Sequence, residues 1–415
     1  MSKISLQTYN QSQHGVSTDE ISPSARAIIT KLLEHGYQAY IVGGAVRDLI
    51  LGKHPKDFDI ATNATPDQIK NVFQRNCRLI GRRFRLAHVY HNREMFEVAT
   101  FRGVAEEGER VVKQGQIIKD NVYGTIEQDA IRRDFTCNAL YLDIQSGNIL
   151  DYCCGYKDTK DHKLKFIGED SIRIIEDPIR MIRAIRFEVK LGLAISESTK
   201  QAIIKEHKTL SNVSMARLFD ELVKLFHCGN ASDGYQLMNE LMLFSLVLPQ
   251  ASKAINQEPR YINLISNALK STDSRILAKK SVTPIFLFSC FFWPLLHGKA
   301  QRLASNGMSQ YEAINKAASE VFIGARKNIA IPKIVQIGIR HIWLLQYRFQ
   351  TTRGKKVYIT LEHPRFRAAY DFLLLRKHES DVLKAQCEWW THIQTLSRTK
   401  QKELIFQKKK HHRKR

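Results

Sequence analysis

Two aspartates one residue apart, Asp57 and Asp59, carry the clearest potential for chemistry in this chain of 415 residues. If they lie on a strand, both carboxylates point to the same face while Phe58 points to the other, into a core. Adjacent carboxylates repel unless a cation lies between them, and Mg²⁺ prefers hard oxygen ligands while leaving room for substrate phosphates. Two such ions can serve phosphoryl transfer, one by lowering the pKa of an attacking hydroxyl and one by holding a triphosphate. A pair of solvated acids at a strand end is the alternative interpretation.

Two glycines upstream of the aspartates favour phosphate chemistry. Gly43 and Gly44 lie between a predicted strand and a predicted helix. Glycine lets a phosphate approach the backbone closely, and a helix N-terminus presents free N–H groups to an anion. Arg47 adds a permanent positive charge one turn further on. An ordinary turn between a strand and a helix is the alternative.

The spacing of apolar residues and the turn signals indicate which elements position these groups. Thr65 and Pro66 are typical of a helix start, as N-cap and first helical residue. A hairpin is expected to turn at Asn92 and Arg93. The expected elements before residue 145 are helices over 24–36, 45–51 and 67–75 and strands over 39–42, 58–61, 86–91, 95–100 and 140–144. Helical patterns dominate afterwards, so the chain is predicted to be α/β in its first third and mostly α-helical beyond it.

Four motifs occur in a characteristic order, at residues 42–48 (VGGAVRD), 56–64 (KDFDIATNA), 132–140 (RRDFTCNAL) and 176–187 (EDPIRMIRAIRF). Together they resemble the class II nucleotidyltransferases, the family of bacterial poly(A) polymerases and tRNA CCA-adding enzymes. The resemblance implies an α/β nucleotidyltransferase head of the polymerase-β type with a small mixed sheet. Mostly α-helical neck, body and C-terminal RNA-binding regions would follow this head.

The resemblance also implies roles for the carboxylates. Asp57 and Asp59 match the metal ligands of the family. Asp134 matches the acidic residue of the R-R-D motif and is expected to be a third catalytic carboxylate. Glu97 is its rival, because it lies on a predicted hairpin strand that could pair beside the strand of the aspartates. Both remain candidates at this point, and Asp134 could instead anchor its own motif.

Nucleotide binding is implied for a set of glycines, arginines and polar residues from all four motifs and the hairpin strand. Asp177 and Arg180 match the family's protein-based template, in which one side chain accepts and the other donates hydrogen bonds to a base edge. At a spacing of three residues we expect the two to share a helix face, which Arg183 and Arg186 continue. A solvated arginine face is the alternative for that ridge. The expected nucleotide-binding residues are Gly43, Gly44, Arg47, Arg102, Arg132, Arg133, Asn138, Asp177, Arg180, Arg183 and Arg186.

The second half of the chain resembles the poly(A)-adding members more than the CCA-adding members, at residues 78–89, 291–296, 331–333 and 361–372. An enzyme that extends varied single-stranded RNA needs charge contacts and aromatic platforms that tolerate any sequence. The expected RNA-binding cations are Arg340, Arg353, Lys355, Lys356, Arg365 and Arg367. Aromatic residues lie near them in the sequence, at Trp343, Tyr347, Phe349, Tyr358 and Phe366. For these aromatics a place in the helical core is the alternative.

The composition favours a polyanionic partner over a membrane. The formal net charge is +23, and the stretch 399–415 contributes +7, so the rest of the chain still carries +16. No apolar run reaches the roughly 18 residues of a membrane span, and residues 285–296 indicate a buried helix instead. The first twenty residues lack the apolar segment of a secretion signal. Seven scattered cysteines without a C-x-x-C pair predict reduced thiols in a cytoplasmic protein and argue against a zinc site.

The expected organisation has five parts: a flexible N-terminal arm (1–22), the nucleotidyltransferase head (23–160), a helical neck with the nucleotide-selecting and RNA-binding region (161–275), a helical, arginine-rich C-terminal RNA-binding domain (276–400) and a basic tail (401–415). The tail either adds non-specific RNA affinity or is a solvated end without a specific role.

The expected function is template-independent addition of AMP from ATP to RNA 3′ ends by two-metal phosphoryl transfer, a modification that promotes RNA decay. The expected cofactor is Mg²⁺, with Mn²⁺ as a substitute, and ATP is the substrate. The expected partners are RNA 3′ ends and the RNA-decay machinery, and the protein is expected to be a monomer. A tRNA CCA-adding nucleotidyltransferase and a catalytically inactive RNA-binding protein on the same scaffold are the alternatives.

Overall fold

The structure is a computed structural model that describes residues 5–81, 85–103, 111–113, 116–119 and 122–406. The chain forms two compact units. Unit 1 comprises residues 1–180 and 191–205, and unit 2 comprises residues 181–190 and the chain from 206 onward. Most of the expected basic tail lies outside the described residues.

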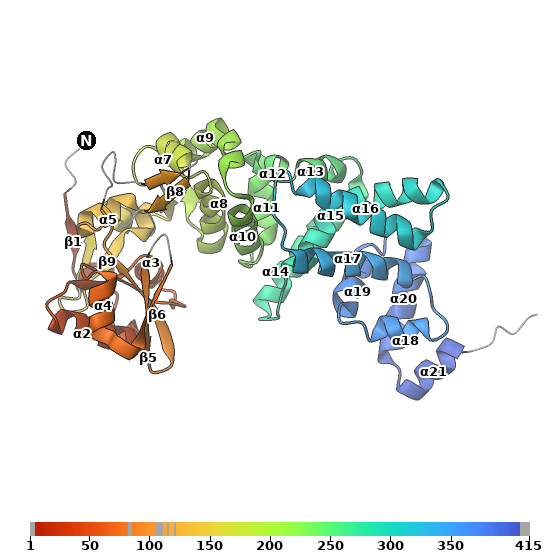
Figure 1. Ribbon diagram of the computed structural model, residues 1–415, viewed down its shortest axis with the longest axis horizontal. Helices are drawn as coiled ribbons and strands as arrows, with labels where there is room; N and C mark the ends of the chain where they lie inside the picture. Colours follow the sequence, from red (N-terminus) through yellow and green to blue (C-terminus); the bar gives the residue numbers. More distant parts are fainter. Residues whose placement is uncertain (1–4, 82–84, 104–110, 114–115, 120–121, 407–415) are drawn as a thin grey trace, which may run out of the picture. The chain divides into compact units, whose positions relative to one another are not determined.

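An eight-stranded mixed sheet runs through unit 1 (Figure 1). Its strand order is β1-β10-β9-β2-β3-β6-β5-β4, and β3 and β6 are its one parallel pair. The strands are β1 (Gln7–Tyr9), β2 (Ala39–Val42), β3 (Asp59–Thr62), β4 (Cys77–Ile80), β5 (Leu86–His91), β6 (Glu94–Thr100), β9 (Leu140–Leu142) and β10 (Ile149–Asp151). Two separate pairs join β7 (Val111–Lys113) to β8 (Gln116–Lys119) and β11 (Lys163–Leu164) to β12 (Ala194–Ile195).

The two faces of the sheet belong to different cores, because successive side chains of a strand point to opposite sides. Ile60 of β3 and Val98 of β6 are buried in the larger core, with apolar residues of α2, α3 and α4. Val42 and Ala61 point the other way, into a smaller core that includes Ala130 of α5. The helices of unit 1 are α1 (Gln11–His14), α2 (Pro23–Glu34), α3 (Gly44–Ile50), α4 (Pro66–Phe73), α5 (Ile126–Arg132), α6 (Gly155–Lys160), α7 (Asp170–Glu176) and α9 (Glu197–Glu206).

Local signals placed two elements correctly. The Thr65 side chain accepts a hydrogen bond from the backbone N–H of Gln68, with Pro66 as the first residue of α4, so this predicted helix start is confirmed. The predicted hairpin of β5 and β6 is also confirmed. Its turn residues Asn92 and Arg93 have φ angles of 47° and 67°, as a tight hairpin turn requires.

The N-terminal segment differs from the flexible arm that we expected over residues 1–22. Strand β1 pairs with β10 at the edge of the sheet, and α1 starts at a capping box built on Asn10. The side chains of Val16 and Ile21 are buried in the larger core of the sheet. The polar composition concealed the order of this segment, because few apolar residues among those described from residue 5 onward enter the core.

Unit 2 is built from helices, as predicted for this part of the chain (Figure 1). They are α8 (Arg180–Leu191), α10 (Met215–Phe226), α11 (Ala231–Glu240), α12 (Leu243–Val247), α13 (Pro249–Ile255), α14 (Pro259–Leu277), α15 (Pro284–Ser305), α16 (Gln310–Ala325), α17 (Lys333–Arg348), α18 (Lys356–Leu361), α19 (Phe366–Leu375), α20 (Asp381–Thr395) and α21 (Arg398–Phe406). Four short 3₁₀ helices complete the described chain: η1 (Thr18–Glu20), η2 (Gln74–Asn76), η3 (Thr136–Asn138) and η4 (His207–Asn212).

The most apolar helix, α15, lies in the core of unit 2. Its residues from Leu287 to Pro294 are buried, and the indole N–H of Trp343 on α17 donates to the Ser289 carbonyl over 3.1 Å. Burial of these apolar side chains explains why a helix with so few polar residues is stable without a membrane. Within the described residues, no helix is long and apolar enough to cross a membrane.

Packing of α6 against η3 depends on Gly155. A Cβ atom added at Gly155 would overlap the backbone carbonyl of Thr136 in η3. We expect Gly155→Ala to lower the free energy of unfolding of unit 1 by about 1–3 kcal/mol, because neither backbone can move without disturbing the other. Urea denaturation followed by far-ultraviolet circular dichroism measures this loss.

Gly298 on α15 is the matched control, because a Cβ there meets nothing within 4 Å. Gly298→Ala should leave stability unchanged or raise it by up to about 1 kcal/mol. All four tryptophans lie in unit 2, so tryptophan fluorescence reports the unfolding of that unit separately. Equal stability of Gly155→Ala and the unmodified protein would contradict the packing argument.

Candidate active site

The carboxylates gather where β3 begins. Asp59 is the first residue of β3 and pairs with Val42 at the end of β2. The parallel register of β3 and β6 pairs Ile60 with Val98, so Glu97 lies next to Asp59 on the same face of the sheet. Partial burial, followed by the charge of Glu97, raises the pKa of Asp59, while the Arg133 guanidinium lowers it. Of the two rivals, Glu97 is the one that the sheet places beside Asp59.

Asp57 lies just before β3 and is exposed to solvent, so our assumption that both aspartates occupy one strand was wrong. Strand β3 starts one residue later than predicted because β2, its partner, ends at Val42 opposite Asp59. The Asp57 carboxylate still contributes to the raised pKa of Asp59, which indicates that the two charges are close. Asp57 is therefore close to Asp59 because it lies two residues before β3 begins, and not because the two residues alternate along one strand.

The donor chemistry of this cluster suits a hard divalent cation, since the charges of Glu97 and Asp57 help to raise the pKa of Asp59 and a positive charge would relieve this repulsion. Among the residues that the structure describes, no three His, Cys, Asp or Glu side chains converge as a ready-made metal cage. Mg²⁺ is usually held by one or two carboxylates together with substrate phosphates and water, so Asp57 and Asp59 match that mode of binding.

The glycine turn, Gly43 and Gly44, joins β2 to α3 and is held in place by the side chain of Arg47. Gly43 has φ 73° and ψ −126°, a conformation that favours glycine, and a Cβ there would lie 3.4 Å from Nη1 of Arg133. Arg47 is buried and donates to Oδ1 of Asn138 over 2.5 Å and to Oδ1 of Asp48 over 2.8 Å and 2.9 Å. In this structure the Arg47 side chain therefore fixes the turn to the R-R-D motif.

Asp134 is also tied to its own motif. Its Oδ1 accepts from the backbone N–H of Phe135 over 2.9 Å and from Nδ2 of Asn138 over 3.1 Å. Asn138 is buried and thus links Asp134 to Arg47. These bonds correspond to the anchoring role that we left open for Asp134.

Arg133 is held in place by a residue that the sequence analysis missed, Asp129. Oδ2 of Asp129 accepts from Nη2 of Arg133 over 2.9 Å and from the Tyr141 hydroxyl over 2.7 Å, and its Oδ1 accepts from the backbone N–H of Arg102 over 3.1 Å. Burial and the neighbouring Asp129 charge raise the pKa of the Tyr141 hydroxyl, so Tyr141 stays protonated and donates. The spacing of four residues between Asp129 on α5 and Arg133, which caps the end of that helix, was the available signal.

Asp177 and Arg180 do not share a helix, contrary to our expectation. Asp177 caps the end of α7, with φ −149° and ψ 87°, and α8 begins at Arg180. Pro178 explains the break, because a proline pushes the residue before it out of the helical region and cannot continue the hydrogen-bonding pattern. The two remain close, since the backbone N–H of Arg180 donates to the Asp177 carbonyl over 3.0 Å.

A second missed residue, Arg173 on α7, connects this region to the R-R-D motif. Its guanidinium donates to the backbone carbonyls of Arg132 and Arg133 and to Oε2 of Glu176, the last over 2.6 Å. Arg180 donates to the same Glu176 oxygen over 3.1 Å and to the Arg173 carbonyl over 2.7 Å. One half-buried arginine thus couples the backbone of the R-R-D motif to the side chain of Arg180.

Arg183 and Arg186 follow Arg180 along α8 at the expected spacing. Both guanidinium groups lie over the ring of Phe187, at 5.9 Å and 4.5 Å from its centre. Nε of Arg186 is also 3.5 Å from Oε2 of Glu221 on α10. The arginine ridge is therefore partly packed and is not a fully solvated face.

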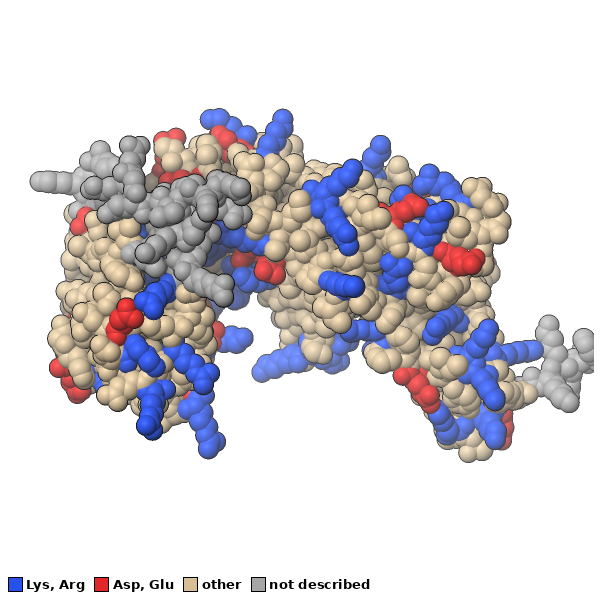
Figure 2. Space-filling view, viewed as in Figure 1, with Lys and Arg blue, Asp and Glu red and all other residues tan. Residues whose placement is uncertain are grey.

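The expected RNA-binding cations of unit 2 differ in their exposure to solvent. Arg353, Lys355, Lys356 and Arg367 are exposed, and Figure 2 shows lysine and arginine side chains scattered over the visible face. Arg340 is half-buried and donates to the Asn315 carbonyl over 2.9 Å, and Arg365 is half-buried as well. Among the aromatic residues that we considered as base platforms, Trp343, Phe349 and Phe366 are buried, so the core alternative holds for these three.

Comparison with known proteins extends these observations. Three family models match the chain: the poly A polymerase head domain over residues 39–165, the probable RNA- and SrmB-binding site of polymerase A over 192–255, and the polymerase A arginine-rich C-terminus over 306–415. Poly(A) polymerase I of Salmonella typhi is 42% identical over 404 residues, which cover 95% of this chain and 87% of that protein.

The sequence similarity to CCA-adding enzymes covers a smaller part of the chain. The CCA-adding enzyme of Bacillus pumilus is 39% identical over 199 residues, 48% of each chain. The crystal structure of the Bacillus stearothermophilus CCA-adding enzyme in complex with CTP superposes with a TM-score of 0.51 at 24% identity, covering 90% of this chain and 99% of that one. This structural likeness supports the fold, including the predicted nucleotidyltransferase head.

Proposed function

The chain belongs to the family of bacterial poly(A) polymerases and tRNA CCA-adding nucleotidyltransferases, and we propose that it adds AMP from ATP to the 3′ ends of RNA. The observation that carries this proposal is the 42% identity to a poly(A) polymerase I over 95% of the chain, against about half of the chain for the CCA-adding relative. The enzyme is a nucleotidyltransferase. The match to polymerase A is not limited to the head, because residues 306–415 also match the model of the arginine-rich C-terminus of polymerase A.

In this proposal Asp57 and Asp59 hold Mg²⁺, for which Mn²⁺ can substitute. The bound metal would supply positive charge to the triphosphate and lower the pKa of the attacking RNA hydroxyl. Glu97 is the third carboxylate, because the sheet holds it beside Asp59 on the same face. Asp134 acts by positioning, since its Oδ1 orders the Phe135 backbone and Asn138.

In this proposal the nucleotide's phosphates bind at the glycine turn, where Gly43 and Gly44 leave the backbone open. Arg102, Arg132 and Arg133 are proposed to supply positive charge to them. Asp177 and Arg180 are the groups proposed to select the base, and Arg183 and Arg186 extend the basic ridge beyond them. The hydrogen bond between Arg47 and Asn138 would keep the glycine turn rigid while the phosphates bind.

In this proposal RNA is bound by exposed cations, namely Arg353, Lys355, Lys356 and Arg367. The half-buried residues Arg340 and Arg365 also contribute. Contacts of this kind recognise phosphates and tolerate any sequence, as an enzyme acting on many RNAs requires.

All seven cysteines are free thiols, which supports a cytoplasmic location. We also propose that the protein acts as a monomer and that the added tails mark RNA for the decay machinery.

Incubation with Mg²⁺, an unstructured RNA and one nucleoside triphosphate at a time tests the proposed function. We expect long ladders with ATP alone, because base selection resides in the protein and no template strand is needed. Addition that requires CTP and a tRNA-like end would instead identify a CCA-adding enzyme. The absence of any addition would identify an inactive RNA-binding protein.

Asp57→Ala and Asp59→Ala should each lower the rate of extension by about a thousandfold or more, since each removes a charge that holds the metal. RNA affinity, measured by gel shift, should change little because the proposed RNA contacts are lysines and arginines. Asp19→Ala is the matched control, because the Asp19 side chain is 87% exposed and pairs with Arg26 on the surface. An active Asp59→Ala enzyme would refute the metal assignment.

Arg173→Lys should lower kcat/KM for ATP by about ten- to a hundredfold and weaken the preference for ATP over CTP. A lysine cannot reach two carbonyls and the Glu176 carboxylate at once, so Arg180 would lose its fixed position. The measurement is steady-state kinetics with each triphosphate. RNA affinity should remain unchanged.

Arg26→Lys, on an exposed surface pair, is the control for the Arg173 variant. Glu176→Gln provides a second variant if Arg173→Lys unfolds the head, because it weakens the link to Arg180 and leaves the two carbonyl contacts in place. Unchanged nucleotide preference in both variants would show that Arg173 only stabilises the fold.

A further inference from the structure

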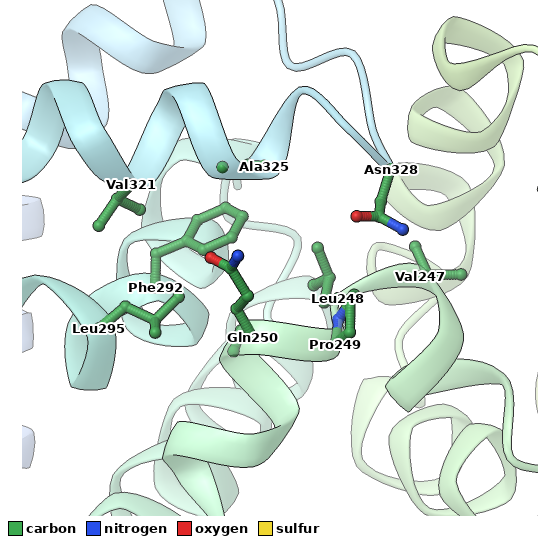
Figure 3. Close-up of a pocket in the computed structure, with 11 residues that line it drawn as sticks. Val247, Leu248, Pro249, Gln250, Phe292, Leu295, Val321, Ala325 and Asn328 are labelled. Carbon is green, nitrogen blue, oxygen red and sulfur yellow. The ribbon is translucent and has the colours of Figure 1, made fainter.

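Two hollows lie within unit 2, and among the described residues that line them no charge is left unpaired. The smaller, between Phe292, Gln250 and Asn328, measures about 20 Å³ and has room for about one water molecule (Figure 3). The larger measures about 290 Å³, and its one arginine, Arg376, pairs with Glu379 at 3.1 Å. Uncompensated positive charge lies instead around two histidines of the same unit.

His341 on α17 and His363, between α18 and α19, lie side by side and are half-buried. Their ring centres are 5.2 Å apart, and their planes are nearly perpendicular, at 88°. Nδ1 of His363 accepts from the backbone N–H of Arg365 over 3.0 Å, so the ring proton of neutral His363 lies on Nε2. Protonation of Nδ1 would break this bond. Among the described residues no such bond holds His341, so His341 is the ring that gains a proton at the lower cost.

Among the described residues, the charges that act on this histidine pair are all positive. Burial, followed by the charges of Arg365, Arg348 and Arg340, lowers the pKa of His341. Burial, followed by His341 and the charges of Arg348 and Arg365, lowers the pKa of His363. All three arginines are themselves half-buried, so water screens their repulsion less than it would on an open surface.

The carboxylates of the described helices that pack against α17 do not compensate these cations. Helices α15, α17 and α18 contain no acidic residue. Arg340 donates to neutral groups, the Asn315 carbonyl over 2.9 Å and the Ser319 hydroxyl over 3.2 Å. The other charged side chains of these helices are lysines and arginines. The four acidic residues on or beside α16, α18 and α19 contact other groups at 2.5–3.0 Å: Glu312 contacts Ser309, Glu320 contacts Lys299, Glu362 contacts Arg398 and Asp371 contacts Arg367.

Like charges held this close repel, and an anion among them removes the repulsion. A phosphate group fits best, since its oxygens accept several charge-assisted hydrogen bonds from guanidinium and imidazolium donors. We propose that one phosphate group of the RNA backbone binds here, and that His341 takes up a proton when it binds. The site consists of His341, His363, Arg340, Arg348 and Arg365. The proposal rests on the proposed action on RNA, for which Arg340 and Arg365 were already expected contacts, and it adds the two histidines, Arg348 and the proton.

The proton gives RNA binding at this site a defined dependence on pH. In the free protein the neighbouring arginines favour the neutral ring of His341. A bound phosphate reverses the local charge and raises the pKa of His341, so the complex holds more protons than the free protein. The extra affinity is therefore fully present below the pKa of the free protein and is lost as the pH rises through the pKa of the complex.

The test measures binding of a labelled oligouridylate of about fifteen nucleotides to the full chain, by fluorescence anisotropy without divalent metal and at constant ionic strength. Uracil takes up no proton in the range used, so the RNA bases do not contribute. The Kd of the unmodified protein should rise about five- to tenfold between about pH 6 and about pH 8, since one linked proton changes affinity by at most about tenfold per pH unit. His341→Gln keeps a polar side chain that cannot be protonated, and it should reduce this ratio by about threefold or more.

His378→Gln is the matched control, because His378 is exposed in the same unit and follows α19. It should keep the pH dependence of the unmodified protein. Calorimetry in buffers of different ionisation enthalpy counts the protons directly, and RNA binding near pH 7 should take up fewer of them in His341→Gln than in the unmodified protein. Equal pH dependence of His341→Gln and the unmodified protein would overturn the proposal.

Arg348→Gln provides a second variant if His341→Gln does not fold, as a circular dichroism melt would show. Removal of one phosphate contact should reduce the slope of log Kd against log salt concentration by about one. Arg26→Gln, on an exposed surface pair of unit 1, should leave that slope unchanged. The same slope in Arg348→Gln and the unmodified protein would contradict the phosphate contact.

Two outcomes separate the RNA phosphate from other sources of the effect. His341→Gln could lose binding of inorganic phosphate, measured by equilibrium dialysis, yet keep the RNA affinity and pH dependence of the unmodified protein. The site would then bind free phosphate, and the RNA assignment would be wrong. A protein that shows the expected pH dependence but never adds AMP would refute the proposed function and leave the phosphate site intact.

Discussion

Repulsion between the carboxylates at the start of β3 is the constraint around which unit 1 is organised. Asp57, Asp59 and Glu97 are brought together by the end of β2 and by the parallel pairing of β3 with β6. Such a cluster persists only if the backbone that carries it cannot relax, and strands that are hydrogen-bonded on both sides meet this need. The charge of Arg133 lowers the pKa of Asp59, and Arg133 is itself fixed by Asp129 and Tyr141. The electrostatics of the site therefore depend on a partly buried ion pair.

Several arginines of this basic chain act as internal braces. Arg47, Arg133 and Arg173 tie the glycine turn, the R-R-D motif and the end of α7 together through carbonyl and carboxylate contacts. Arg376 does the same between α19 and α15 in unit 2. The planar guanidinium with its several donors suits this use, because one side chain can satisfy several acceptors at once. The net charge of +23 consequently overstates the charge that is free to meet RNA.

The elements that were predicted correctly are those specified by neighbouring residues. The capping box at Thr65 and the turn at Asn92 and Arg93 need only local geometry, and both formed as expected. The break between Asp177 and Arg180 could also have been predicted, since Pro178 forbids a continuous helix. The contacts of Arg173 with carbonyls some forty residues earlier could not, because no periodicity links residues brought together by tertiary packing. The choice between Glu97 and Asp134 likewise required the register of two strands that are distant in sequence.

The proposed function relies on two kinds of contact to nucleic acid, and their physics differs. Exposed lysines and arginines release counterions when they meet phosphates, so their contribution falls steeply as salt rises and is indifferent to sequence. Hydrogen bonds to a base edge, as proposed for Asp177 and Arg180, depend instead on which base is present. Charge would therefore decide how much RNA is bound, and hydrogen bonding would decide which nucleotide is added.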